Sequence, residues 1–238
     1  MIAPGVRLRL GQLAERLALP DRAPIALAQL LGLLSSDPLA PTTVRDPRRA
    51  LDAHVADALV ALELEPVLAA RQIADLGSGA GFPGLVLAAA LPNAQMTLVE
   101  SSRRKCAFLE RAVDEMRLEN VTVVAERAEA WQAGRGSQDV VTARALAPLN
   151  VLVEYAAPLL RDGGALVAWK GRRDAAEEVD GAAAAAETGM AAAEIRPVRP
   201  WAGAEHLHLH VYLKVRPTPN RFPRRPGMAS KRPIRASA

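Results

Sequence analysis

Short apolar runs alternate with amphipathic segments from Gln72 onward, and this alternation determines the predicted fold. A short run of Val, Ile, Leu and Ala is typical of a parallel strand buried on both faces of its sheet. The segments between the runs repeat their apolar positions at helical spacing. The predicted strands cover residues 73–76, 96–99, 121–125, 140–142, 165–169, 193–197 and 207–215, and the predicted helices cover 84–91, 103–117, 149–160 and 175–186.

Strand–helix units followed by a final pair of strands are typical of a doubly wound sheet. We therefore predict the α/β class, with a mainly parallel, seven-stranded, Rossmann-like sheet. In sheets of this kind, ligands bind outside the carboxyl ends of the strands. The residues that follow each strand are thus the candidates for a binding site.

The first part of the chain has a different, purely helical pattern. Residues 7–19 and 24–34 predict two short amphipathic helices, and Asp46 with Pro47 predicts the start of a third. We expect an N-terminal helical cap over residues 1–45, the sheet domain over 46–215 and a tail over 216–238.

The tail differs from the rest of the chain in charge. Residues 216–238 hold seven Arg or Lys, five Pro and no acidic residue, so a tail of +7 follows a body of about −3. A basic tail favours a polyanionic partner, because cations that neutralise phosphates release counterions. The alternative is a short disordered tail of an Arg-rich chain. In either case the tail lacks the periodicity of a packed element, and we expect a loose arm or one that orders on docking.

Membrane, export and disulfide signals are weak. The longest apolar runs, such as residues 85–91, are far shorter than the roughly 18 residues of a membrane span. Residues 1–11 lack the layout of a signal peptide. The single cysteine, Cys106, excludes an internal disulfide framework. We expect a monomeric cytoplasmic protein without membrane contact.

The strongest local signal is a glycine-rich turn between the first strand and the next helix, where residues 75–84 read DLGSGAGFPG. Gly77, Gly79 and Gly81 allow a tight turn and a close approach of the backbone to a ligand. A dinucleotide-binding turn would have Gly or Ala at position 82, where this chain has Phe82. The turn therefore favours the methyl donor S-adenosylmethionine over NAD.

Glu100 ends the second strand, 23 residues after Gly77. A carboxylate at this place can accept hydrogen bonds from both hydroxyls of an adenosine ribose. This feature serves NAD and S-adenosylmethionine alike, so the two cofactors remain open, with the methyl donor favoured by the turn.

Several further motifs, taken in order, resemble one family. They are Glu100-Ser101, Arg104-Lys105, Phe108-Leu109, residues 118–121, Arg127-Ala128-Glu129, Arg144-Ala145 and Lys170-Gly171. With the turn at 75–84, they make the chain from about residue 42 onward similar to the 16S ribosomal RNA guanine-N7 methyltransferases, the RsmG or glucose-inhibited division protein B family. The resemblance implies an enzyme that transfers a methyl group from S-adenosylmethionine to N7 of a guanine in small-subunit ribosomal RNA.

The resemblance also implies roles for single residues. Gly77 and Phe82, with Gly79 in the same turn, are expected to line the donor pocket, and Glu100 keeps its ribose role. The remaining donor-site candidates are Ala128 and Glu129, which would face the adenine, and Arg144, which would reach the donor or the incoming base. Arg144 is thus the candidate catalytic residue, and an ion pair beside the fourth strand is the alternative.

The candidate RNA contacts lie after the fifth strand and in the tail, where Phe222-Pro223-Arg224-Arg225 looks like the family's terminal Tyr-Pro-Arg-Lys stretch. The expected partner is 16S ribosomal RNA or the small ribosomal subunit. The expected RNA-binding residues are Lys170, Arg221, Arg224, Arg225, Lys231 and Arg232. The family's His-Ile-Leu-Asp-Ser stretch appears here as residues 54–58, HVADA, which puts an RNA contact from that region in doubt.

The acceptor chemistry agrees with a guanine N7. Methylation at a pyrimidine C5 needs a cysteine nucleophile, but Cys106 falls within a predicted helix, away from the expected reaction face. Adenine amino-group enzymes usually carry Asn or Asp followed by Pro-Pro and an aromatic residue after the fourth strand, where this chain reads TARA. Guanine N7 has a free lone pair, so alignment with the methyl group suffices without a general base.

Other interpretations remain open. A small-molecule methyltransferase would share the donor residues, and an RNA-binding regulator would need no catalysis. His54 and Asp57 are spaced to form a local helical pair. Trp169 at a strand end favours packing, with base stacking as the alternative. The histidines at 206, 208 and 210 share one face of a strand but lack an evident fourth ligand, so we expect no metal site.

Overall fold

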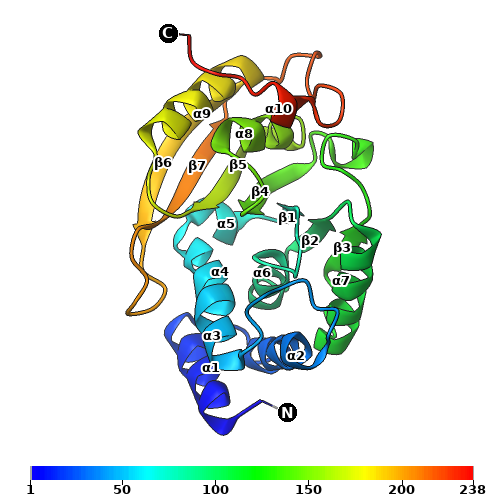
Figure 1. Cartoon of the computed structure of the whole chain (residues 1–238), viewed down its shortest axis with the longest axis vertical. Coiled ribbons are helices and arrows are strands. Elements are labelled where there is room, and N and C mark those ends of the chain that lie inside the picture. Colours follow the sequence, from blue (N-terminus) through cyan, green and yellow to red (C-terminus); the bar gives the residue numbers. More distant parts are fainter. Residues whose placement is uncertain (1, 238) are drawn as a thin grey trace.

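A computed structural model describes residues 2–237 and contains a seven-stranded sheet in the order β3-β2-β1-β4-β5-β7-β6 (Figure 1). Strands β1 to β5 pair in parallel, and β7 runs antiparallel between β5 and β6. The strands are β1 Gln72–Leu76, β2 Gln95–Val99, β3 Val121–Val124, β4 Gln138–Arg144, β5 Leu160–Lys170, β6 Met190–Val198 and β7 Leu207–Lys214. The predicted fold class is confirmed.

Helices cover both faces of the sheet, which explains why the central strands are continuous apolar runs. Helices α6 (Gly84–Ala90) and α7 (Arg103–Met116) share one hydrophobic cluster with the N-terminal helices. Helices α8 (Leu149–Ala156) and α9 (Ala175–Thr188) belong to a second cluster on the opposite face. Each predicted helix of the domain is present, with ends shifted by a few residues.

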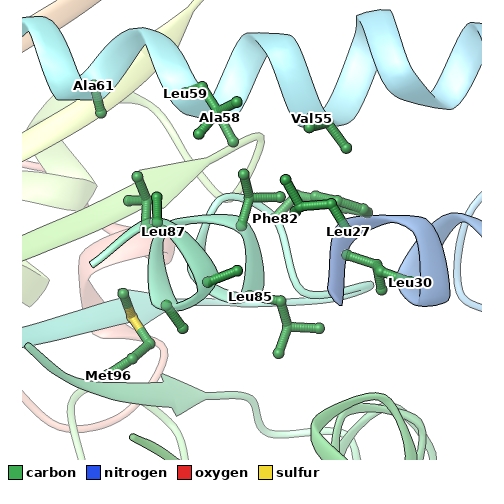
Figure 2. Close-up of a cluster of buried hydrophobic side chains, with 14 of the residues drawn as sticks. Leu27, Leu30, Val55, Ala58, Leu59, Ala61, Phe82, Leu85, Leu87 and Met96 are labelled. Carbon is green, nitrogen blue, oxygen red and sulfur yellow. The ribbon is translucent and has the colours of Figure 1, made fainter. Parts of the chain in front are cut away.

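The N-terminal helix α2 (Ala23–Ser36) packs against α6 and α7, and α1 (Pro4–Arg16) packs against α2. Figure 2 shows Leu27 and Leu30 of α2 beside Phe82 and Leu85, which follow the glycine turn. These side chains are buried and belong to one cluster. The cap therefore shares its core with the sheet domain, and the division at residue 45 stays a prediction from the sequence.

Residues 47–69 form several short helical pieces where the sequence predicts one helix. Asp46 caps the start, because its side chain accepts hydrogen bonds from two backbone amides. The pieces are α3 (Pro47–Ala50), a π-helical turn (Leu51–Ala56), α4 (Asp57–Leu59), a 3₁₀ turn (Val60–Glu63) and α5 (Glu65–Ala69). The predicted cap is present, but the π-helical turn, of a kind frequent at functional sites, was not predicted.

The C-terminal segment corrects one expectation. Residues 217–237 pack on the domain through buried Phe222 and Ala229 and include a short helix, α10 (Met228–Lys231). Figure 1 shows this segment against α8 and α9. The prediction of a loose arm is wrong, because scattered apolar residues and backbone groups fix the segment without any periodic pattern. Within residues 2–237, no helix is long and apolar enough to cross a lipid bilayer.

Candidate active site

The glycine turn between β1 and α6 has the backbone that its sequence requires. Gly77, Gly79 and Gly81 have φ angles of +66°, +58° and +93°, a region that side chains with a Cβ rarely adopt. The amide of Gly77 donates to the Val99 carbonyl at 2.8 Å, which ties the turn to the end of β2. The turn is thus held at the carboxyl ends of the two central strands.

Asp75, in β1 just before the turn, supports the turn through hydrogen bonds of its side chain. Its fully buried carboxylate accepts hydrogen bonds from the Thr142 hydroxyl at 2.9 Å and from the Gly84 amide at 3.2 Å. Burial raises the pKa of Asp75 to about 6, although these hydrogen bonds act in the opposite direction. Asp75 links β1, β4 and the start of α6, a role that the sequence did not assign. The available signal was an acidic residue inside an otherwise apolar strand.

Glu100 lies directly beside the turn. Its carboxylate accepts hydrogen bonds from the Gly79 amide at 3.2 Å and the Ser102 amide at 2.9 Å, and Lys105 lies 3.7 Å away. The side chain is almost completely buried among these groups. An anionic acceptor is therefore fixed at the end of β2, next to the backbone of the glycine turn.

Ala128 and Glu129 lie in the loop that follows β3. The amide of Glu100 donates to the Val124 carbonyl at 3.0 Å, so this loop starts next to Glu100. The buried carboxylate of Glu129 accepts a hydrogen bond from the Gly227 amide at 2.8 Å. The structure therefore brings the loop after β3 to the same edge of the sheet as Glu100 and the glycine turn.

A second cluster surrounds Phe82 at the end of the turn. The ring of His54 stacks on Phe82 with centroids 4.4 Å apart, and the Arg144 guanidinium carbon lies 5.4 Å from the Phe82 centroid. Phe82 is buried in the cluster that includes the N-terminal helices. Phe82, which distinguishes this turn from a dinucleotide-binding turn, therefore also joins the turn to the helical segment that precedes β1.

Arg144, the last residue of β4, binds the π-helical turn and α4. Its guanidinium donates to the Asp57 carboxylate at 2.7 Å, the Ala53 carbonyl at 2.9 Å and His54 Nδ1 at 3.1 Å. The ion pair considered from the sequence is present, whereas its role toward a ligand stays a prediction. His54 and Asp57 are joined through Arg144, so the predicted local pair is replaced by contacts to a residue far away in sequence.

The His54 ring is neutral at pH 7. Burial lowers its pKa to about 4, and the nearby Arg144 charge acts in the same direction. Its Nδ1 lies 3.1 Å from both the Arg144 guanidinium and the Ala53 carbonyl, and its Nε2 lies 3.1 Å from the Thr42 hydroxyl. Trp169 is also engaged here, since its indole donates to the Asp57 carbonyl at 2.9 Å, and this supports the packing interpretation.

The geometry fits S-adenosylmethionine on two observations. An ideal Cβ on Gly79 would meet only the Gly77 carbonyl, at 3.7 Å, so the turn leaves open space at this position. Glu100 supplies a fixed anionic acceptor beside it, as an adenosine ribose requires. At Gly77, by contrast, a Cβ would lie 2.6 Å from Leu146, which closes that side of the turn.

Comparison with known proteins is decisive for the family. Residues 38–199 match the family model GidB, described as rRNA small subunit methyltransferase G. A ribosomal RNA small subunit methyltransferase G from Rubrobacter xylanophilus is 42% identical over 197 residues, which cover 80% of this chain and 76% of the relative. A protein of the same name from Chloroflexus aggregans is 41% identical, with 81% and 82% covered. The chain belongs to the rRNA small subunit methyltransferase G family.

Solved structures agree with the methyltransferase fold. A SAM dependent methyltransferase from Aquifex aeolicus superposes with a TM-score of 0.54 at 15% identity, covering 70% of this chain and 93% of that chain. A branched-chain polyamine synthase mutein from Thermus thermophilus gives 0.62 at 16% identity, covering 84% and 65%. The predicted family, fold class and enzyme class are confirmed. S-adenosylmethionine is confirmed as the cofactor of this class of enzyme.

The residues predicted to contact RNA differ in whether their side chains form ion pairs within the protein. Lys170 donates to the Ala147 carbonyl and pairs with Glu177. Arg224 pairs with the buried Glu154, and Arg221 pairs with Glu187 at the surface. Arg221, Arg225, Lys231 and Arg232 are exposed. Arg224 is therefore engaged in an ion pair with a buried carboxylate, and its contact with RNA stays a prediction.

Two other residues considered for chemistry, Cys106 and His208, contact backbone carbonyls within the fold. The Cys106 thiol is buried, donates to the Glu100 carbonyl at 3.1 Å and has a pKa raised by burial and by Glu100, which disfavours the thiolate. His208 contacts the Gly171 carbonyl at 3.0 Å. Among residues 2–237, no group of three His, Cys, Asp or Glu side chains is placed to hold a metal ion.

Proposed function

We propose that this enzyme transfers a methyl group from S-adenosylmethionine to N7 of a guanine in 16S ribosomal RNA. The observation that carries the proposal is the glycine turn with Glu100 fixed at the end of β2, in a chain of the small-subunit rRNA methyltransferase G family. A small-molecule acceptor would leave the exposed cations of the C-terminal segment unexplained.

The donor-binding residues are those at the carboxyl ends of β1, β2 and β3. Glu100 would accept hydrogen bonds from the ribose, the positive φ angles of Gly77 and Gly79 give the turn its shape, and the loop with Ala128 and Glu129 would border the adenine. S-adenosylmethionine, when bound, supplies an electrophilic methyl group on a sulfonium. The protein's own task is to fix the position of that group at the edge of the sheet.

The acceptor side requires alignment more than proton transfer. Guanine N7 has a lone pair at neutral pH, so no residue must remove a proton before methyl transfer. The neutral His54 and the ion-paired Arg144 then hold the glycine turn against the π-helical turn and α4. Arg144 is the last residue of β4, and the incoming base is expected at this end of the strand.

The RNA partner is recognised through phosphates. Arg225, Lys231 and Arg232 are exposed on the C-terminal segment, and Lys170 ends β5 at the reaction edge. Cations in such positions contribute affinity that falls with salt. The enzyme acts as a monomer in the cytoplasm on 16S ribosomal RNA or on the small subunit that contains it.

Melting curves test the donor assignment. S-adenosylhomocysteine, the product of the donor, should raise the melting temperature because it binds only the native state, whereas NAD should not.

Glu100→Ala should weaken donor binding by roughly 1.5–3 kcal/mol in calorimetry, since charge-assisted hydrogen bonds to the ribose are lost. An equal response to NAD, or unchanged donor affinity in the variant, would contradict this site.

A further inference from the structure

The C-terminal segment from residue 217 to 237, here called the strap, is tied to the domain along its whole length. Asn150 donates to the Ile234 carbonyl at 2.7 Å, the Tyr155 and Ser230 hydroxyls lie 3.1 Å apart, and the Ala236 amide donates to Asp180 at 3.0 Å. These partners belong to α8 and α9, over which the strap runs in Figure 1. The strap is thus a fixed element of the fold.

One ion pair anchors the strap at its centre. Glu154 of α8 is only 1% exposed, and the Arg224 guanidinium binds both of its carboxylate oxygens, with the Nε contact at 2.8 Å. A carboxylate this deeply buried needs a bound cation, because its desolvation is otherwise uncompensated. The pair raises the already high pKa of Arg224, so the guanidinium stays charged. Loss of either partner would release this part of the strap.

Three residues after Arg224, the strap reaches the candidate donor site. The Gly227 amide donates to Glu129 at 2.8 Å, and Glu129 lies in the loop that starts beside Glu100. Gly227 has a φ of +82°, which a glycine adopts without strain. A single hydrogen bond therefore connects the anchored strap to a buried carboxylate of the loop that follows β3.

We propose that Arg224 and Glu154 are positioning residues for the donor site: their ion pair sets the strap so that Gly227 holds Glu129 and fixes residues 125–131. This inference rests on the proposed function only in requiring that this site binds S-adenosylmethionine. A basic residue near the end of the chain, in a stretch expected to contact RNA, then acts on donor binding from inside the protein.

Calorimetry with S-adenosylhomocysteine on the full-length protein tests the proposal. Arg224→Ala should weaken binding at least fivefold because the strap loses its anchor. Arg235→Ala removes the same charge from an exposed position on the same strap and should stay within twofold of the wild type. Glu154→Gln should weaken binding like Arg224→Ala, although it changes the net charge in the opposite direction.

Two further measurements separate positioning from general loss of stability. In assays with rising donor concentration, Arg224→Ala should raise the donor KM while kcat at saturation stays near the wild type. If Arg224→Ala fails to fold, Glu129→Gln and Glu129→Ala give the same test from the other end of the contact. Gln keeps an oxygen that accepts from Gly227 and should bind the donor much better than Ala.

The outcomes are distinguishable. Wild-type protein that does not bind S-adenosylhomocysteine would contradict the proposed function itself. Wild-type binding with unchanged affinity in Arg224→Ala and Glu154→Gln would overturn only the positioning role. An equal loss in Arg235→Ala would also overturn it, because the effect would then follow charge rather than the anchor.

Discussion

Single residues at the strand ends determine the candidate site, and most of them could be predicted. Glycines in a turn and an acid at a strand end carry their own local signal, so the sequence alone predicts Gly77, Gly79 and Glu100 as site residues. Asp57 and Arg144 are 87 residues apart in the chain, and only the folded sheet brings them to 2.7 Å. A contact of that kind has no local sequence signal.

Gly77→Ala tests the glycine turn at this scale. The variant should lose stability and donor affinity, because its φ of +66° is strained for alanine and its Cβ would displace the Leu146 side chain, 2.6 Å away. Gly136→Ala is the matched control, since Gly136 has a φ of +62° with no atom within 4 Å of an added Cβ. It should cost about 1–2 kcal/mol of stability from backbone strain and leave donor binding intact. Equal donor affinity in both variants would contradict the role of the turn.

The pKa of His54 gives a pH test. In the unfolded chain a histidine gains its proton near pH 6.5, whereas His54 in the fold resists until about pH 4. The native state therefore loses stability relative to the unfolded state as pH falls through this window. Because the ring is partly solvated, we expect a loss of about 1–2 kcal/mol, less than the full shift implies.

Urea unfolding at pH 7 and pH 4.5 measures this effect in wild type and His54→Gln. Asp75, with its pKa raised to about 6, contributes stability in the opposite direction over the same window, but it is common to both proteins. The wild type should lose more stability than the variant on acidification. A difference between them that does not change with pH would contradict a buried neutral His54.

At the scale of elements, the periodicity of apolar residues predicts the regular strands and helices but neither the π-helical turn nor the packing of the strap. The strands and helices of the sheet domain were predicted in order, because burial on both faces leaves apolar runs in the sequence. The π-helical turn at Leu51–Ala56 shares its apolar spacing with an ordinary helix, so it was predicted as one. The strap is fixed by an ion pair and by backbone hydrogen bonds, which leave no period at all.

Deletion of residues 217–238 tests the strap as an element. The truncated protein should lose stability, donor affinity and RNA affinity together, because the segment packs on α8 and reaches Glu129. A triple alanine variant of Arg225, Lys231 and Arg232 is the comparison. It should keep donor affinity but lower the salt dependence of RNA binding, by roughly 0.7–0.9 in slope for each lost phosphate contact. Unchanged donor binding in the truncated protein would restore the interpretation of a separate arm.

For the whole molecule, the structure shows which of the C-terminal positive charges are paired with acidic residues. The body carries about −3 and the C-terminal residues +7, yet part of that positive charge is neutralised inside the fold by Glu154 and at its surface by Glu187. The exposed remainder lies on the strap, which also contacts the loop beside Glu100. Under the proposed function, one segment would then serve both the RNA side and the donor side of the reaction.

The most direct test is methyl transfer by the purified protein. Small subunits from cells that lack the gene are incubated with S-adenosylmethionine labelled in its methyl group, and the digested RNA is separated into nucleosides. We predict that the label appears in 7-methylguanosine at one position, that wild-type subunits accept none, and that Glu100→Ala gives little. Label in another nucleoside, or none in subunits that lack the modification, would contradict the account.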